Sequence, residues 1–156
     1  MSIYSCLAAL ALAFLPINGA NAGTYNTPSK LIELFEQTCL VHFPNFDAAQ
    51  AEARRKGFNR VSPSQSEIGN TITNVVTYIH RNKAHCLVTG HGLSPEETAK
   101  ALTATLAMRG ATGLKIRSNR RVGQGKLILA GRKVTILSQP ELASTRIPGV
   151  KITLSQ

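Results

Sequence analysis

The residues best suited to chemistry in this sequence are its cysteines and histidines. Cys39 and His42 stand three positions apart, and on one helix such a pair can act as a thiolate and its base. Cys39 can instead form a disulfide with Cys86, which competes for the same sulfur. We favour the disulfide, because the residues around Cys39 lack the local motif of a papain-like nucleophile. Two unlinked buried thiols are the remaining alternative.

Two histidines give the best candidate for a metal site. We expect His80 and His85 to face each other across a hairpin, where both imidazoles could reach one ion. Zinc sites usually take at least three protein ligands, and His91 lies about 20 Å beyond His85 on an extended strand. We therefore predict a solvent-facing polar pair, with no metal and no cofactor.

Other catalytic motifs fail in their details. Glu96 and Glu97 are adjacent, and adjacent residues do not face each other on a helix. The segment 123–126 resembles the end of a phosphate-binding loop, but Arg120 replaces the first glycine and Leu127 replaces the serine or threonine. His-Glu-x-x-His, Gly-x-Ser-x-Gly and Cys-x-x-Cys do not occur in the sequence. We predict no catalytic residue.

The uneven distribution of charge is the strongest indication of function. Residues 23–80 carry five Lys or Arg and five Asp or Glu, whereas residues 81–156 carry thirteen and three. The whole net charge of +10 therefore lies in the second half. Such a surface attracts anions, and the attraction falls as salt rises. The candidate anion-binding residues are Lys115, Arg117, Arg120, Arg121 and Lys126.

These residues favour a non-enzymatic protein that binds an anionic envelope component, such as lipopolysaccharide phosphates, lipid headgroups or acidic glycans, or an acidic protein. Nucleic acid is disfavoured, because the basic stretch has no aromatic side chains on which bases could stack. A basic surface that only keeps the protein soluble is an open alternative. So are a small periplasmic enzyme with a site assembled from scattered residues and an inhibitor or immunity-type binder.

The N-terminal segment predicts export to the periplasm or beyond. Residues 6–17 are all apolar, and Ala20-Asn21-Ala22 matches a signal-peptidase site, although no Lys or Arg precedes them. Twelve apolar residues are too few to span a bilayer, which takes roughly 20. We expect residues 1–22 to be removed as a signal peptide.

Cleavage would leave residues 23–156 as a single globular domain without a transmembrane segment. Cys6 would leave with the signal peptide. An oxidising compartment favours the pairing of Cys39 with Cys86.

Three helices are expected to support the basic strands. The first opens at Thr27-Pro28 and runs to about Val41, with Cys39 on its apolar face. The second is short, begins after Asp47 as its N-cap and ends at Gly57. The third begins with a capping box at Ser94 and ends at Gly110. The predicted inward side chains of the first and third helices are Leu31, Ile32, Phe35, Cys39, Ala99, Leu102 and Leu106.

Alternating side chains predict the strands. A hairpin of residues 72–80 and 85–88 turns at Asn82-Lys83 and sets Ile79 opposite Cys86, with Val75, Ile79, Cys86 and Val88 inward. Further strands are expected at residues 114–117, 126–130, 133–137 and 150–154, with a turn at Gly131-Arg132. The predicted fold class is α+β, with a mostly antiparallel sheet of five or six strands, two or three helices packed on it and one disulfide.

One part of the chain suggests a family. The residues Phe35 and Cys39, the motif Phe46-Asp47-x-Ala-x-Ala and the run from Arg54 to Phe58 resemble small exported proteobacterial proteins of unknown function. The resemblance covers residues 35–58 and implies neither an activity nor a site.

Overall fold

The computed structural model describes residues 25–58, 66–69, 73–80, 83–117, 122–142 and 148–156. The expected signal peptide, together with Arg120 and Arg121, lies outside these ranges. Within the described ranges, no helix is long and apolar enough to cross a membrane.

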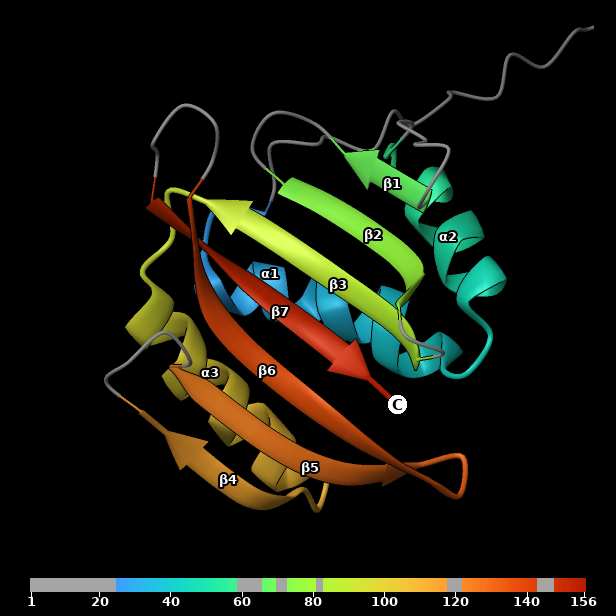
Figure 1. Cartoon of the computed structure of the whole chain (residues 1–156). Coiled ribbons are helices and arrows are strands. Elements are labelled where there is room, and N and C mark those ends of the chain that lie inside the picture. The colour runs from blue at the N-terminus through green and yellow to red at the C-terminus, as the bar shows by residue number, and fades with distance from the viewer. Residues whose placement is uncertain (1–24, 59–65, 70–72, 81–82, 118–121, 143–147) are drawn as a thin grey trace, which may run out of the picture.

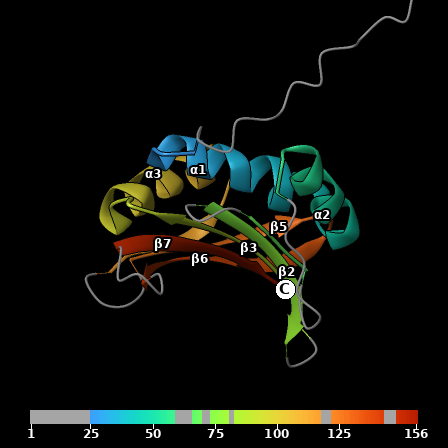
Figure 2. The same ribbon diagram turned by 90° about the horizontal axis from the view of Figure 1, so that it is seen from above.

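Seven strands of the described chain form one antiparallel sheet in the order β1-β2-β3-β7-β6-β5-β4 (Figure 1). Their bounds are β1 (Ser66–Gly69), β2 (Thr73–His80), β3 (Lys83–His91), β4 (Thr112–Ile116), β5 (Gly123–Leu129), β6 (Arg132–Leu142) and β7 (Pro148–Ser155). The helices all lie on one face of this sheet (Figure 2). The predicted α+β fold class is thus confirmed. The additional strand is β1, which lies where the polar sequence suggests only a connection.

The first helix and its inward face agree with the prediction. α1 (Pro28–Phe35) continues into a π-helical segment, η2 (Glu36–Leu40), and Thr27 Oγ1 accepts a hydrogen bond from the Lys30 N–H at 3.3 Å. The predicted inward side chains of this helix, including Cys39, are all buried. The helix therefore packs against the sheet through the expected apolar face.

The second helix, α2 (Phe46–Arg55), begins earlier than predicted. Asn45 is its N-cap in place of Asp47, because the Asn45 side-chain oxygen accepts a hydrogen bond from the Ala48 N–H at 3.0 Å. The predicted end is confirmed, since Gly57 adopts a positive φ of 94° and Phe58 is buried.

The third helix, α3 (Pro95–Met108), lies directly on β5. Ser94 Oγ accepts a hydrogen bond from the Glu97 N–H at 3.3 Å, which confirms the predicted N-cap. Two glycines of β5 allow the close approach of the helix. A Cβ at Gly123 would lie 3.2 Å from Ala99 Cβ, and one at Gly125 would lie 2.9 Å from Leu106 Cδ1. These contacts hold the strand that carries Lys126 against the core.

The disulfide joins the helical layer to the sheet. Cys39 of η2 and Cys86 of β3 are bonded and fully buried, with their Cα atoms 5.6 Å apart. The predicted pairing is confirmed. With its sulfur in this bond, Cys39 is not a thiolate, so the Cys39–His42 nucleophile does not exist in the oxidised protein.

The predicted register of the β2–β3 hairpin is wrong by two residues. Thr77, not Ile79, lies opposite Cys86, and His80 lies opposite Lys83. Residues 81 and 82 lie outside the described ranges, while Lys83 belongs to β3 rather than to a turn. A shift of two keeps every side chain on its predicted face, so the apolar pattern cannot tell the two registers apart. Accordingly, Val75, Cys86 and Val88 are buried as expected.

The turn between β5 and β6 also differs by one residue from the prediction. Ala130 and Gly131 connect the strands, both with positive φ (47° and 73°), and Arg132 is already the first residue of β6. Two positive φ values define the type I′ turn that suits a tight hairpin. This register places Lys133 opposite Ile128.

Candidate anion-binding surface

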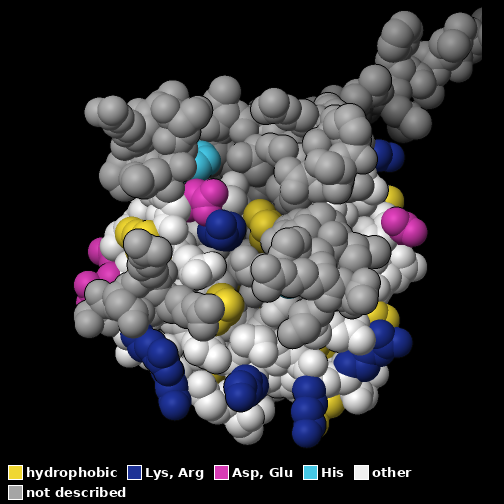
Figure 3. Space-filling model, in the orientation of Figure 1, with side chains coloured by type: hydrophobic (Ala, Val, Ile, Leu, Met, Phe, Trp, Pro, Cys, Tyr) yellow, Lys and Arg dark blue, Asp and Glu magenta, His cyan; other side chains and the backbone are white. Residues whose placement is uncertain are grey.

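The exposed basic side chains of β4, of the residue that follows it, of β5 and of the start of β6 form one border of the molecule, which we call the basic edge. Its described members are Lys115, Arg117, Lys126, Arg132 and Lys133. Figure 3 shows Lys and Arg side chains spaced along the lower border of the sheet face that carries no described helix. The sequence has no Asp or Glu between Glu97 and Glu141, so this border is positive throughout.

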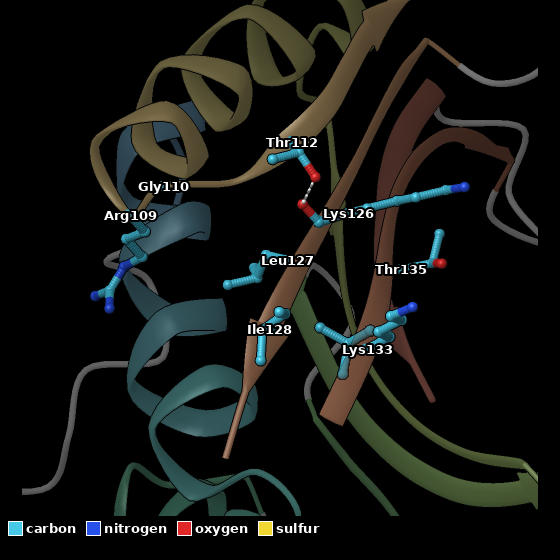
Figure 4. A pocket seen from close by; sticks show the side chains of 9 residues that line it. Arg109, Gly110, Thr112, Lys126, Leu127, Ile128, Lys133 and Thr135 are labelled. Carbon is cyan, nitrogen blue, oxygen red and sulfur yellow. Dashed lines mark hydrogen bonds between the residues drawn. The ribbon is translucent and has the colours of Figure 1, made fainter. Parts of the chain in front are cut away.

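Strand pairing brings two lysines of the basic edge together. Lys126 of β5 lies opposite Thr135 of β6, and Lys133 is two positions from Thr135 on the same strand. Because side chains two positions apart share a face, both ammonium groups project to the same side of the sheet, with Thr135 between them (Figure 4). Two cations beside one hydroxyl group can together contact a phosphate or carboxylate.

The basic edge lacks acidic partners. Six ion pairs occur in the described part of the chain, but none involves Lys115, Arg117, Lys126 or Lys133. Arg132 donates a hydrogen bond to the neutral side chain of Gln156 at 3.1 Å. The positive charge of this border is therefore not compensated within the described chain and is free to attract an external anion.

A pocket of about 540 Å³ opens beside the end of β5. Arg109 lines it, but its guanidinium points away from β5 in Figure 4 and pairs with Glu36 at 2.6 Å. Lys126 and Lys133 thus remain as the pocket's cations without an acidic partner in the described chain. The lining residues are Arg109, Gly110, Thr112, Lys126, Leu127, Ile128, Lys133, Val134 and Thr135.

The sequence identified part of this surface. Lys115, Arg117 and Lys126 are exposed on the basic edge as predicted, whereas Arg120 and Arg121 lie outside the described residues. The prediction missed Arg132 and Lys133. Lys133 and Thr135 alternate with buried Val134 and Ile136, and the predicted hairpin already places Lys133 on the same face as Lys126.

The remaining candidates do not form a site. His85 lies opposite Tyr78 rather than His80, so the two histidines are not directly across from each other. The described residues contain no group of three His, Cys, Asp or Glu side chains that could hold a metal ion. The glycines and lysine of the rejected phosphate-loop motif belong to β5, where the backbone is extended and does not form a loop around a phosphate.

Comparison of the chain with protein-family models, with curated proteins and with solved structures found no match. The fold and the charges of the chain itself therefore carry the functional argument.

Proposed function

We propose that this protein is an exported, non-enzymatic protein that binds an anionic component of the cell envelope through the basic edge. The observation that carries the proposal is the set of lysines on β4, β5 and β6 that are exposed and have no acidic partner in the described chain. The buried disulfide and the apolar N-terminal segment support an oxidising, extracytoplasmic location.

The magnitude of the attraction follows from the number of lysines. A Lys close to an anionic membrane surface contributes about 1 kcal/mol of binding free energy. Lys115, Lys126 and Lys133 together should then contribute about 3 kcal/mol, which corresponds to roughly a hundredfold in affinity. Because the contacts are exposed, this contribution should decline as salt is raised.

The test compares two triple variants of equal net charge. One variant carries Lys115→Gln, Lys126→Gln and Lys133→Gln. The matched control replaces three exposed bases of α1, α2 and α3, with Lys30→Gln, Arg54→Gln and Lys100→Gln. Binding to lipopolysaccharide, to phosphatidylglycerol vesicles and to polyglutamate is measured by co-sedimentation at low and high salt.

The basic-edge variant should lose about a hundredfold in affinity at low salt, while the control retains most of its binding. An equal loss in both variants would mean that net charge alone attracts the anion, and the proposal for this surface would then be wrong. Lack of binding of the unmodified protein to all three polyanions would exclude the function itself.

A further inference from the structure

An exposed aliphatic side chain lies among the cations of the basic edge. Ile128, on β5, is 67% exposed. It lies opposite Lys133 and two positions from Lys126, so the three side chains share one face at the end of the hairpin. Isolated exposed aliphatic residues are common on protein surfaces. Ile128 differs from such isolated residues, because it lies beside several cations.

The end of the β5–β6 hairpin projects from the sheet. In Figure 1 the turn between these strands extends beyond the neighbouring strand ends at the lower right of the view. Ala130, Gly131 and Arg132 are exposed at this tip. Ile128 and the cations are therefore carried on a protruding part of the molecule, which can reach a flat partner without steric hindrance from the helices on the opposite face.

We propose that the anionic partner of the basic edge is a lipid bilayer surface, and that the β5–β6 hairpin inserts the Ile128 side chain between the headgroups. This inference rests on the proposed function and specifies its ligand. Lys126, Arg132 and Lys133 pair with lipid phosphates, and the apolar stems of the two lysines lie along the boundary while their ammonium groups remain in water. Ile128 contributes apolar burial, which salt does not screen.

An acidic protein segment would use a different part of the same region. β4 is paired with β5 only as far as Lys126, so the described chain places no strand beside Ile128 on that side. A peptide that added a strand at this edge would bond to the main chain of Ile128 and would depend little on its side chain. A substitution of the Ile128 side chain should therefore weaken binding to a bilayer but leave binding to an added peptide strand nearly unchanged.

The absence of tryptophan from the chain permits a direct test of insertion. Ile128→Trp introduces a single indole at the hairpin, and Val41→Trp is the matched control, because Val41 is 65% exposed but follows η2 in the helical layer. With phosphatidylglycerol vesicles, the Ile128→Trp emission should move to shorter wavelength and become shielded from a water-soluble quencher. The Val41→Trp emission should not change. Vesicles of phosphatidylcholine alone should change neither.

Ile128→Thr tests how much the apolar side chain of Ile128 contributes to binding. Threonine keeps the β-branched shape and replaces the ethyl group of isoleucine by a hydroxyl group. We expect about a tenfold loss of vesicle binding at high salt, as partial burial of a side chain of this size implies, with binding to polyglutamate unchanged. If Ile128→Thr binds vesicles like the unmodified protein and the indole at residue 128 stays in water, bilayer insertion is wrong.

Tight binding to polyglutamate but not to vesicles would also overturn the lipid assignment, while leaving the proposed anion binding in place. Failure to bind any of the three polyanions would remove both the proposed function and the lipid assignment.

Discussion

Reduction of the Cys39–Cys86 bond should lower the stability of this protein by an amount that the position of the bond determines. The two cysteines are 47 positions apart, so the bond closes a loop of about 48 residues in the unfolded chain. The chain-entropy relation gives about 4 kcal/mol for a loop of this length. Typical domains have a net stability of about 5–15 kcal/mol. The cross-link is therefore a large part of the total.

The loss of stability on reduction of the disulfide also predicts a change in melting temperature. The entropy of unfolding is about 2.1 cal/mol/K per residue, which for the proposed mature chain of about 130 residues gives roughly 0.27 kcal/mol/K. A loss of 4 kcal/mol then corresponds to a decrease of about 15 °C in Tm. Reduction is the cleanest perturbation, because both thiols keep almost the volume of the disulfide and no cavity is created in the core.

The assay is thermal unfolding followed by circular dichroism, with and without a phosphine reductant, after thiol titration has confirmed complete reduction. The double variant Cys39→Ala/Cys86→Ala should melt lower still, because both side chains are fully buried and their truncation leaves a cavity. A fully reduced protein that melts within about 3 °C of the oxidised protein would refute the loop-entropy reasoning.

Two further predictions concern the packing of β7 and the acid sensitivity of α2. A Cβ at Gly149 would lie 2.6 Å from the backbone oxygen of Gly90, which cannot move aside, whereas at Gly125 the added atom meets only leucine methyl groups. Urea unfolding should therefore show a larger loss for Gly149→Ala than for Gly125→Ala, and the reverse order would contradict this account. The pKa of the Glu52 carboxyl is lowered below its usual value of 4.5, chiefly by the hydrogen bond from Arg55. The ionised form thus stabilises the folded state above about pH 4.5, and this contribution is lost as pH falls through the lower folded-state pKa. Between pH 6 and pH 3, Glu52→Gln should lose less stability than the unmodified protein; equal losses would show that the Arg55 contact is not responsible.

The sequence predicted those features that depend on local chemistry. The end of α3 at Gly110 and the end of α2 at Gly57 were predictable, because a residue with positive φ closes each helix. The disulfide was predictable because Cys39 lies on an apolar helix stripe and Cys86 on an apolar strand face. In each case a few neighbouring residues fix the outcome.

Features set by competition between similar arrangements were not predictable. Two hairpin registers that differ by two residues bury the same side chains, so nothing in the pattern selects Thr77 over Ile79 as the neighbour of Cys86. The strand β1 has four residues and no marked alternation, and it is formed by pairing with β2. Lys133 could have been predicted, because the expected hairpin already places it on the face of Lys126, and the observed turn at Ala130–Gly131 changes only its partner, to Ile128.

The place of β7 in the sheet also has a consequence for the order in which the sheet can close. β7 lies between β3 and β6, and it pairs Ile152 with both Val88 and Ser138. Before the ribosome has added Ser155, β3 and β6 have no strand between them, and the sheet consists of two separate halves with open edges. Closure of the sheet must therefore wait for β7, which follows the other described strands in sequence, and pairing between residues as distant as those of β3 and β7 is slow.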